Sequence, residues 1–136
     1  MLQTVLAIAG KPGLYELVSR GSKNLIVESL DATRRRMPIF GSDKVISLAD
    51  IAMYTDNDGE VPLPEVLQRV ADKEDAKEVT FDYKKASVED LQAYFAEILP
   101  DFDRDRVYPT DIKKLITWYN LLVNAGITTF VNKTEE

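Results

Sequence analysis

Short strand-type segments alternate with turn residues through the first 55 residues, and this spacing restricts that part of the chain to a small β structure. Leu25 to Leu30 is rich in branched apolar residues, which favour extended backbone. Gly10-Lys11-Pro12-Gly13 and Gly21-Ser22-Lys23-Asn24 interrupt the apolar segments, and Gly and Asn accept the positive φ that hairpin turns need. Strands are predicted over residues 2–9, 14–19, 25–30, 34–40, 45–48 and 51–55.

Strands at this spacing predict a small antiparallel β-barrel, SH3-like in size. Pro38 has no N–H to donate to a neighbouring strand, so the strand at residues 34–40 is expected at an edge. An open antiparallel sheet packed under a helix is the alternative arrangement.

Two longer helical patterns occupy the last 50 residues. Ser87 and Asp90 resemble a capping box at the start of the first, which Pro100 ends. The second is expected to begin near Pro109 and to end before Gly126. Its apolar stripe is broad and comprises Ile112, Leu115, Ile116, Trp118, Tyr119, Leu121, Leu122 and Val123. A helix with so wide a stripe is expected to pack against two surfaces, the other helix and the barrel.

These patterns predict an α+β protein in three parts. Residues 1–60 form the SH3-like antiparallel barrel, residues 61–86 a short helix and a charged linker, and residues 87–136 a helical hairpin. Within the middle part, Pro64 is well placed in the first turn of the short helix.

The chain of 136 residues contains no histidine and no cysteine. Histidine is the usual general base and metal ligand near neutral pH, and cysteine supplies thiolates for metal sites and thiol chemistry. Their absence excludes a Ser-His-Asp triad, a Cys-His dyad, structural zinc and haem. Carboxylate, lysine, tyrosine or magnesium chemistry remains as the least favoured alternative, because no motif indicates it, and we predict a protein that is not an enzyme and has no cofactor. The lack of cysteine and of any apolar run near the ~20 residues that span a bilayer predicts a cytoplasmic protein without membrane contact.

Charge is distributed unevenly. Residues 1–55 carry seven basic and five acidic residues, and residues 56–136 carry ten basic and eighteen acidic ones, so the local net charges are +2 and −8. An acidic surface repels phosphate backbones, so any nucleic acid is expected to bind the first part. The candidate nucleic-acid-binding residues form a basic rim of Lys11, Lys23, Arg34, Arg35, Arg36 and Lys44. A charged edge strand that blocks sheet-to-sheet aggregation is the structural alternative.

A second candidate surface lies around the start of the last helix. Tryptophan, tyrosine and arginine dominate the energetics of protein interfaces. The candidate partner-binding residues are Arg106, Tyr108, Asp111, Lys114 and Trp118. A local charge network and core packing of Trp118 are the alternatives for the same residues.

Three motifs superficially resemble ligand sites. Asp101-x-Asp103-x-Asp105 has the acidic spacing of a calcium loop but lacks its glycine and its bidentate glutamate, so we expect Arg104 and Arg106 to neutralise it. Asp56-x-Asp58-Gly59 has Tyr54 at the first ligand position, which favours an acidic turn. Gly10-Lys11-Pro12-Gly13 lacks the P-loop spacing and is expected to be a tight turn.

A resemblance to a known family rests on eight segments spread along the chain: Gly10 to Tyr15, Ile26 to Leu30, Ser42 to Lys44, Ile51 to Thr55, Val61 to Leu63, Asp103 to Tyr108, Asp111 to Lys114 and Trp118 to Leu122. These segments resemble one uncharacterised bacterial family of Bacteroidetes type, a family of domains of unknown function. The resemblance covers nearly the whole chain and implies a small β domain followed by a helical companion domain, without an assigned activity, ligand or site.

From these observations we predict an adaptor or regulatory module that acts through contacts with a protein partner or with further copies of itself. The alternative is a nucleic-acid-associated protein that uses the basic rim.

Overall fold

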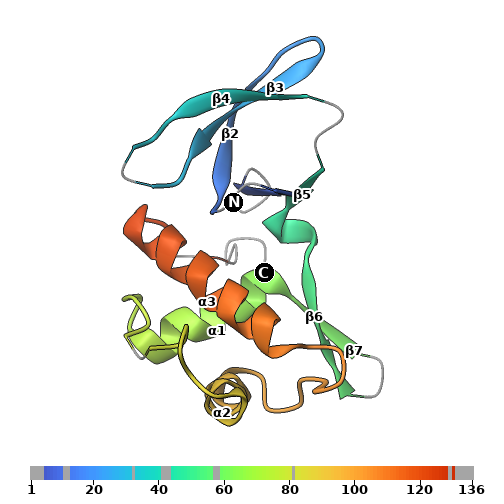
Figure 1. Cartoon of the computed structure of the whole chain (residues 1–136), viewed down its shortest axis with the longest axis vertical. Coiled ribbons are helices and arrows are strands. Elements are labelled where there is room, and N and C mark those ends of the chain that lie inside the picture. Colours follow the sequence, from blue (N-terminus) through green and yellow to red (C-terminus); the bar gives the residue numbers. More distant parts are fainter. Residues whose placement is uncertain are drawn as a thin grey trace, which may run out of the picture.

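The computed structural model describes residues 5–10, 13–31, 33–40, 44–56, 59–80, 82–128 and 130. A five-stranded sheet lies at one end of the molecule and the helices at the other, with a β-hairpin running between them along one side (Figure 1). The strands are β1 (Val5–Ile8), β2 (Tyr15–Arg20), β3 (Asn24–Ser29), β4 (Arg36–Phe40), β5 (Val45–Ser47), β6 (Ala52–Thr55) and β7 (Gly59–Pro62). The helices are α1 (Leu63–Glu74), α2 (Val88–Ile98) and α3 (Pro109–Asn124).

The α+β class predicted from the sequence is confirmed, but the described strands do not form the predicted closed barrel. The five-stranded sheet is antiparallel with the order β4-β3-β2-β1-β5, so β4 and β5 are its edges among the described strands. Pro38 lies on the edge strand β4, as expected from its missing donor. The strand expected at residues 51–55 is present as β6, but it pairs with β7 in a separate two-stranded sheet.

Alternation along β1 assigns the two faces of the large sheet. Leu6 and Ile8 point to one face, where they join a small cluster with Tyr15, Val27 and Ile39. Val5 and Ala7 point to the other face and pack with the helices. The sheet therefore contributes one face to its own small core and the other to the main core of the molecule.

The ends of the helices follow the sequence signals. The Ser87 Oγ accepts a hydrogen bond from the Asp90 N–H (3.1 Å) at the start of α2, which confirms the predicted cap. Helix α3 begins at Pro109, where a missing N–H costs nothing, and ends just before Gly126, whose φ is +86°.

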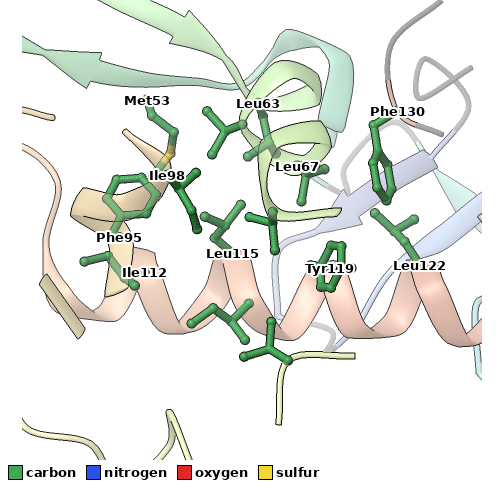
Figure 2. Packing of buried hydrophobic residues seen from close by; sticks show 14 of the residues in the cluster. Met53, Leu63, Leu67, Phe95, Ile98, Ile112, Leu115, Tyr119, Leu122 and Phe130 are labelled. Carbon is green, nitrogen blue, oxygen red and sulfur yellow. The ribbon is translucent and has the colours of Figure 1, made fainter. Parts of the chain in front are cut away.

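Helix α3 is the centre of the main core. Leu115, Tyr119 and Leu122 on one side of α3 face Leu63 and Leu67 of α1 (Figure 2). The same core includes Phe95 and Ile98 of α2, Met53 of β6 and, from the N-terminal part, Val5, Leu14, Leu30 and Leu48. The expectation that the broad stripe of α3 packs against more than one surface is confirmed.

Hydrogen bonds fix the segment between α1 and α2 to α3, and two of them involve the neighbouring residues Tyr119 and Asn120. The Tyr119 hydroxyl donates to the Lys77 carbonyl (2.6 Å), and the Val79 N–H donates to Asn120 Oδ1 (2.8 Å). Val79 and Tyr83 are both buried, although the described residues of this segment form no strand. These contacts hold the charged segment against the core.

Replacing Ala76 by glycine should stabilise the protein. Asp75 and Ala76 follow α1 with φ values of 56° and 59°, a region that disfavours side chains with a Cβ. We expect Ala76→Gly to raise the free energy of unfolding in urea by about 0.5–1 kcal/mol. Ala71→Gly inside α1 is the control and should lower it by about 1 kcal/mol or more. A loss of stability in Ala76→Gly would contradict the backbone assignment.

The hydrogen bond from the Tyr119 hydroxyl to the Lys77 carbonyl is a tether between α3 and the segment after α1, and removing the hydroxyl should show how much it stabilises the protein. The side chain is fully buried and its hydroxyl has a short acceptor, so Tyr119→Phe should lower the free energy of unfolding by about 1 kcal/mol. Tyr108→Phe, at a side chain that is 59% exposed, is the matched control and should leave stability unchanged. Equal effects of the two substitutions would argue against the tether.

Candidate binding groove between the sheet and helix α3

A groove of about 750 Å³ lies between the large sheet and α3, where helix residues from Asp111 to Trp118 line it. The described part of its lining comes from five places in the sequence: β1 with the turn after it, the start of β5, strand β6 with the residue before it, the first residue of α1, and α3 with the residues before it. The turn after β1 contributes Gly10 and Gly13, whose φ values of about 80° are readily adopted by glycine. The site therefore exists only in the folded chain.

The floor of the groove continues the main core. Leu63 and Leu115 are almost completely buried and line the groove as well. Ile46 lies opposite Ala7 in the antiparallel pairing of β5 with β1, so both side chains leave the sheet on the side of the helices. Ile46 is 46% exposed and lies next to the buried floor residues of the groove. This apolar surface is thus open to a ligand.

Two cation–aromatic pairs flank the floor. Lys114 Nζ lies 5.8 Å from the centre of the Trp118 ring, one helical turn further along α3. Arg106 Cζ lies 5.0 Å from the centre of the Tyr54 ring, which β6 presents with 43% exposure. Both distances are within the range of cation–π attraction. Each pair offers an apolar ring together with a positive charge.

The acidic groups near the groove are engaged in local structure. Asp111 Oδ2 accepts from the Tyr108 N–H (2.9 Å) and so holds the first turn of α3. Asp103 Oδ2 accepts from Arg106 Nε (2.9 Å), and Asp103 Oδ1 accepts from the Asp105 N–H (2.9 Å). Among the described residues, the groove lining contains three cations and one carboxylate.

Lys44 and Lys114 keep their charge available to a ligand. Both are exposed, and neither forms an ion pair with another residue in the described part of the chain. Lys44 comes from the sheet side of the groove and Lys114 from α3. The site is therefore suited to an anionic group attached to an apolar one. Within the described ranges, no group of three or more carboxylates is placed to hold a metal ion.

Four of the five residues predicted to bind a partner line the groove, namely Arg106, Asp111, Lys114 and Trp118. Tyr108 is exposed at the start of α3 but is not part of the lining. The sequence analysis missed Tyr54, Ile46 and Met53, because only the packing of β5 and β6 beside α3 brings them to the site. Their one sequence signal is that they lie in strand-type segments.

The residues of the predicted basic rim are spread over the N-terminal part. Arg34 and Arg36 both pair with Glu28, at 3.5 and 3.3 Å. Lys23 precedes β3 and lies beside a second, smaller hollow, whereas Arg34 follows the other end of that strand. Arg35 is exposed before β4, Lys44 lines the groove, and Lys11 lies outside the described residues.

The acidic loop before α3 is organised by its own hydrogen bonds. Arg106 neutralises Asp103, as expected, but Arg104 stacks on the Phe102 ring at 4.4 Å. Asp58 of the second acidic motif and Lys11-Pro12 of the glycine-rich turn lie outside the described residues. Among the helices described, none has the length and apolarity to cross a membrane.

The hydrogen bonds to Asp103 predict a pH dependence of stability. The Asp105 N–H, followed by Arg106, lowers the pKa of the Asp103 carboxyl below its ordinary value. A lowered pKa in the folded state gives stability that is present above the unfolded pKa of about 4 and is lost as the pH falls through the folded pKa. Between about pH 5 and pH 2, the free energy of unfolding should therefore fall less steeply in Asp103→Asn than in the wild type. Parallel curves would contradict this role of Asp103.

The comparisons with known proteins match this two-part architecture. One family model, Domain of unknown function (DUF5606), matches residues 2–48, and another, Domain of unknown function (DUF6852), matches residues 51–122. The chain is 62% identical to a protein from Bacteroides vulgatus with a solution NMR structure from structural genomics, with 96% of this chain and 92% of that chain covered and a TM-score of 0.77. The comparison with curated proteins finds no match. The chain therefore belongs to an uncharacterised family of Bacteroidetes type, in which a DUF5606 part precedes a helical DUF6852 part.

Proposed function

We propose that this protein is a non-enzymatic adaptor or regulatory module that binds another protein in the groove between the sheet and α3. The observation that carries this proposal is that two cation–aromatic pairs, Lys114–Trp118 and Arg106–Tyr54, line the same groove beside an open apolar floor. Aromatic residues and arginine are enriched at protein interfaces, and Trp, Tyr and Arg contribute most to binding energy there.

The chemistry of the lining favours binding over bond-making. Asp111, the one carboxylate among the described lining residues, accepts a hydrogen bond from the backbone at the start of α3. Proton transfer is most often performed by histidine, which this chain lacks. The proposal includes an SH3-like barrel for the N-terminal part and a cytoplasmic setting, both as inferred from the sequence.

Nucleic-acid binding has less support from the geometry. The Arg34 and Arg36 guanidinium groups share Glu28, which offsets part of the positive charge on that edge. A basic face for phosphates needs cations that act together, and here Lys23 and Arg34 flank opposite ends of β3. Loss of binding after nuclease treatment would nevertheless favour this alternative.

Reversing the charge of Lys114 should test the proposed function. We expect quantitative affinity purification from nuclease-treated native lysate to recover a protein with the wild type that is depleted at least about tenfold with Lys114→Glu. The physical reason is that Lys114 is exposed at the groove and its charge lies beside Trp118.

Lys85→Glu is the matched control, because it makes the same charge change at an exposed lysine that does not line the groove. This variant should recover the partner as the wild type does. Equal recovery by all three proteins, or recovery only without nuclease, would contradict a protein-binding groove. Recovery of the chain itself would identify a second copy as the partner.

A further inference from the structure

The start of β5 offers a backbone edge beside the groove. Strand β5 pairs with β1 and with no other described strand. The Ala9 N–H donates to the Lys44 carbonyl (2.9 Å), and Ile8 lies opposite Val45. Along an antiparallel strand, the backbone N–H and C=O groups of one residue bond to the partner strand, and those of the next residue point away from it. The N–H and C=O of Val45 therefore point to the open edge of β5.

The same residue connects the edge to the groove. The Val45 side chain packs with the small cluster on the far face of the sheet, yet Val45 also lines the groove between Lys44 and Ile46. An extended segment paired with this edge would thus run directly beside the apolar floor. Binding by strand addition uses main-chain hydrogen bonds for affinity and pockets for alternate side chains for specificity.

The charges beside the edge indicate which side chains such a segment would carry. Lys44 and Lys114 stand on the two sides of the groove without an acidic partner among the described residues, although the whole chain has a net charge of −6. Ile46 and Trp118 supply the apolar surface between them. An acidic side chain next to a large apolar one would complement both features.

We infer that the partner presents an extended acidic segment that adds to β5 as a further strand, and this inference rests on the proposed function. Side chains of a strand alternate between its two faces, so those that enter the groove are two residues apart. The segment therefore carries an aspartate or glutamate two positions from an aromatic or aliphatic residue. The apolar side chain packs on Ile46 and Trp118, and the carboxylate lies between Lys44 and Lys114.

Selection from a random peptide library displayed on phage, with the full-length protein as bait, tests this inference. Enriched peptides should carry an acidic residue two positions from a large apolar one. Their synthetic forms should bind at least about tenfold more weakly to Lys114→Glu and to Trp118→Ala than to the wild type. Binding should also weaken as sodium chloride rises from about 50 mM to about 500 mM. Amide NMR shifts on binding should be largest around Val45 and Ile46.

The controls distinguish the inference of an acidic strand on β5 from the proposal of a protein-binding groove. Lys85→Glu and Tyr108→Ala should bind the peptides as the wild type does. Peptides that require Trp118 but carry no acidic residue, or that leave the amides of β5 unchanged, would overturn the acidic strand and leave the groove as a protein-binding site. Enrichment of basic peptides would also overturn the acidic strand. Failure to enrich any peptide that depends on Trp118 or Lys114 would count against both.

Discussion

Burial of α3 on more than one side is the interaction on which the rest of the structure depends. Tyr119, Leu122 and Ile112 are completely buried, and the core that they join contains residues of both family domains. Gly13, in the turn after β1, also lies close to Leu121 of α3: a Cβ at Gly13 would stand 3.8 Å from its side chain. Because one helix contacts both parts, the sheet and the helical unit share a core instead of meeting across a polar linker.

The groove is a consequence of this arrangement. Arg106 before α3 and Lys114 and Trp118 on α3 line the opening, whereas Leu121, further along the helix, lies close to Gly13 of the turn after β1. The first turn of α3 is fixed by Asp111, and Arg106 is fixed by Asp103. Hydrogen bonds within the acidic loop thus position one wall of the groove, while the packed residues beneath it set its depth. The same helix therefore contributes both to the core and to one wall of the groove.

Local signals allowed much of the fold to be predicted, because caps, prolines and periodicity act over a few residues. The Ser87 cap, the start of α3 at Pro109 and the edge position of Pro38 are of this kind. The pairing of β6 with β7 was not predicted, since a strand-type segment does not reveal its partner. A sheet of five strands left open between β4 and β5 depends equally on non-local contacts.

The same distinction applies to the candidate site. Arg106, Asp111, Lys114 and Trp118 were predicted together because they lie within about three helical turns of sequence. Lys44 was assigned to the basic rim instead, and Tyr54 and Ile46 were not assigned to any site. Their place beside α3 follows from the path of the chain through β5 and β6, which has no short-range signature.

Quenching of the fluorescence of Trp118, the single tryptophan, measures the charge of the groove directly. The account predicts that iodide quenches Trp118 more efficiently than caesium does, after each is normalised to N-acetyltryptophanamide, although the protein carries a net charge of −6. The preference should disappear in Lys114→Glu. Stronger normalised quenching by caesium in the wild type, as the net charge alone predicts, would contradict a cationic groove beside Trp118.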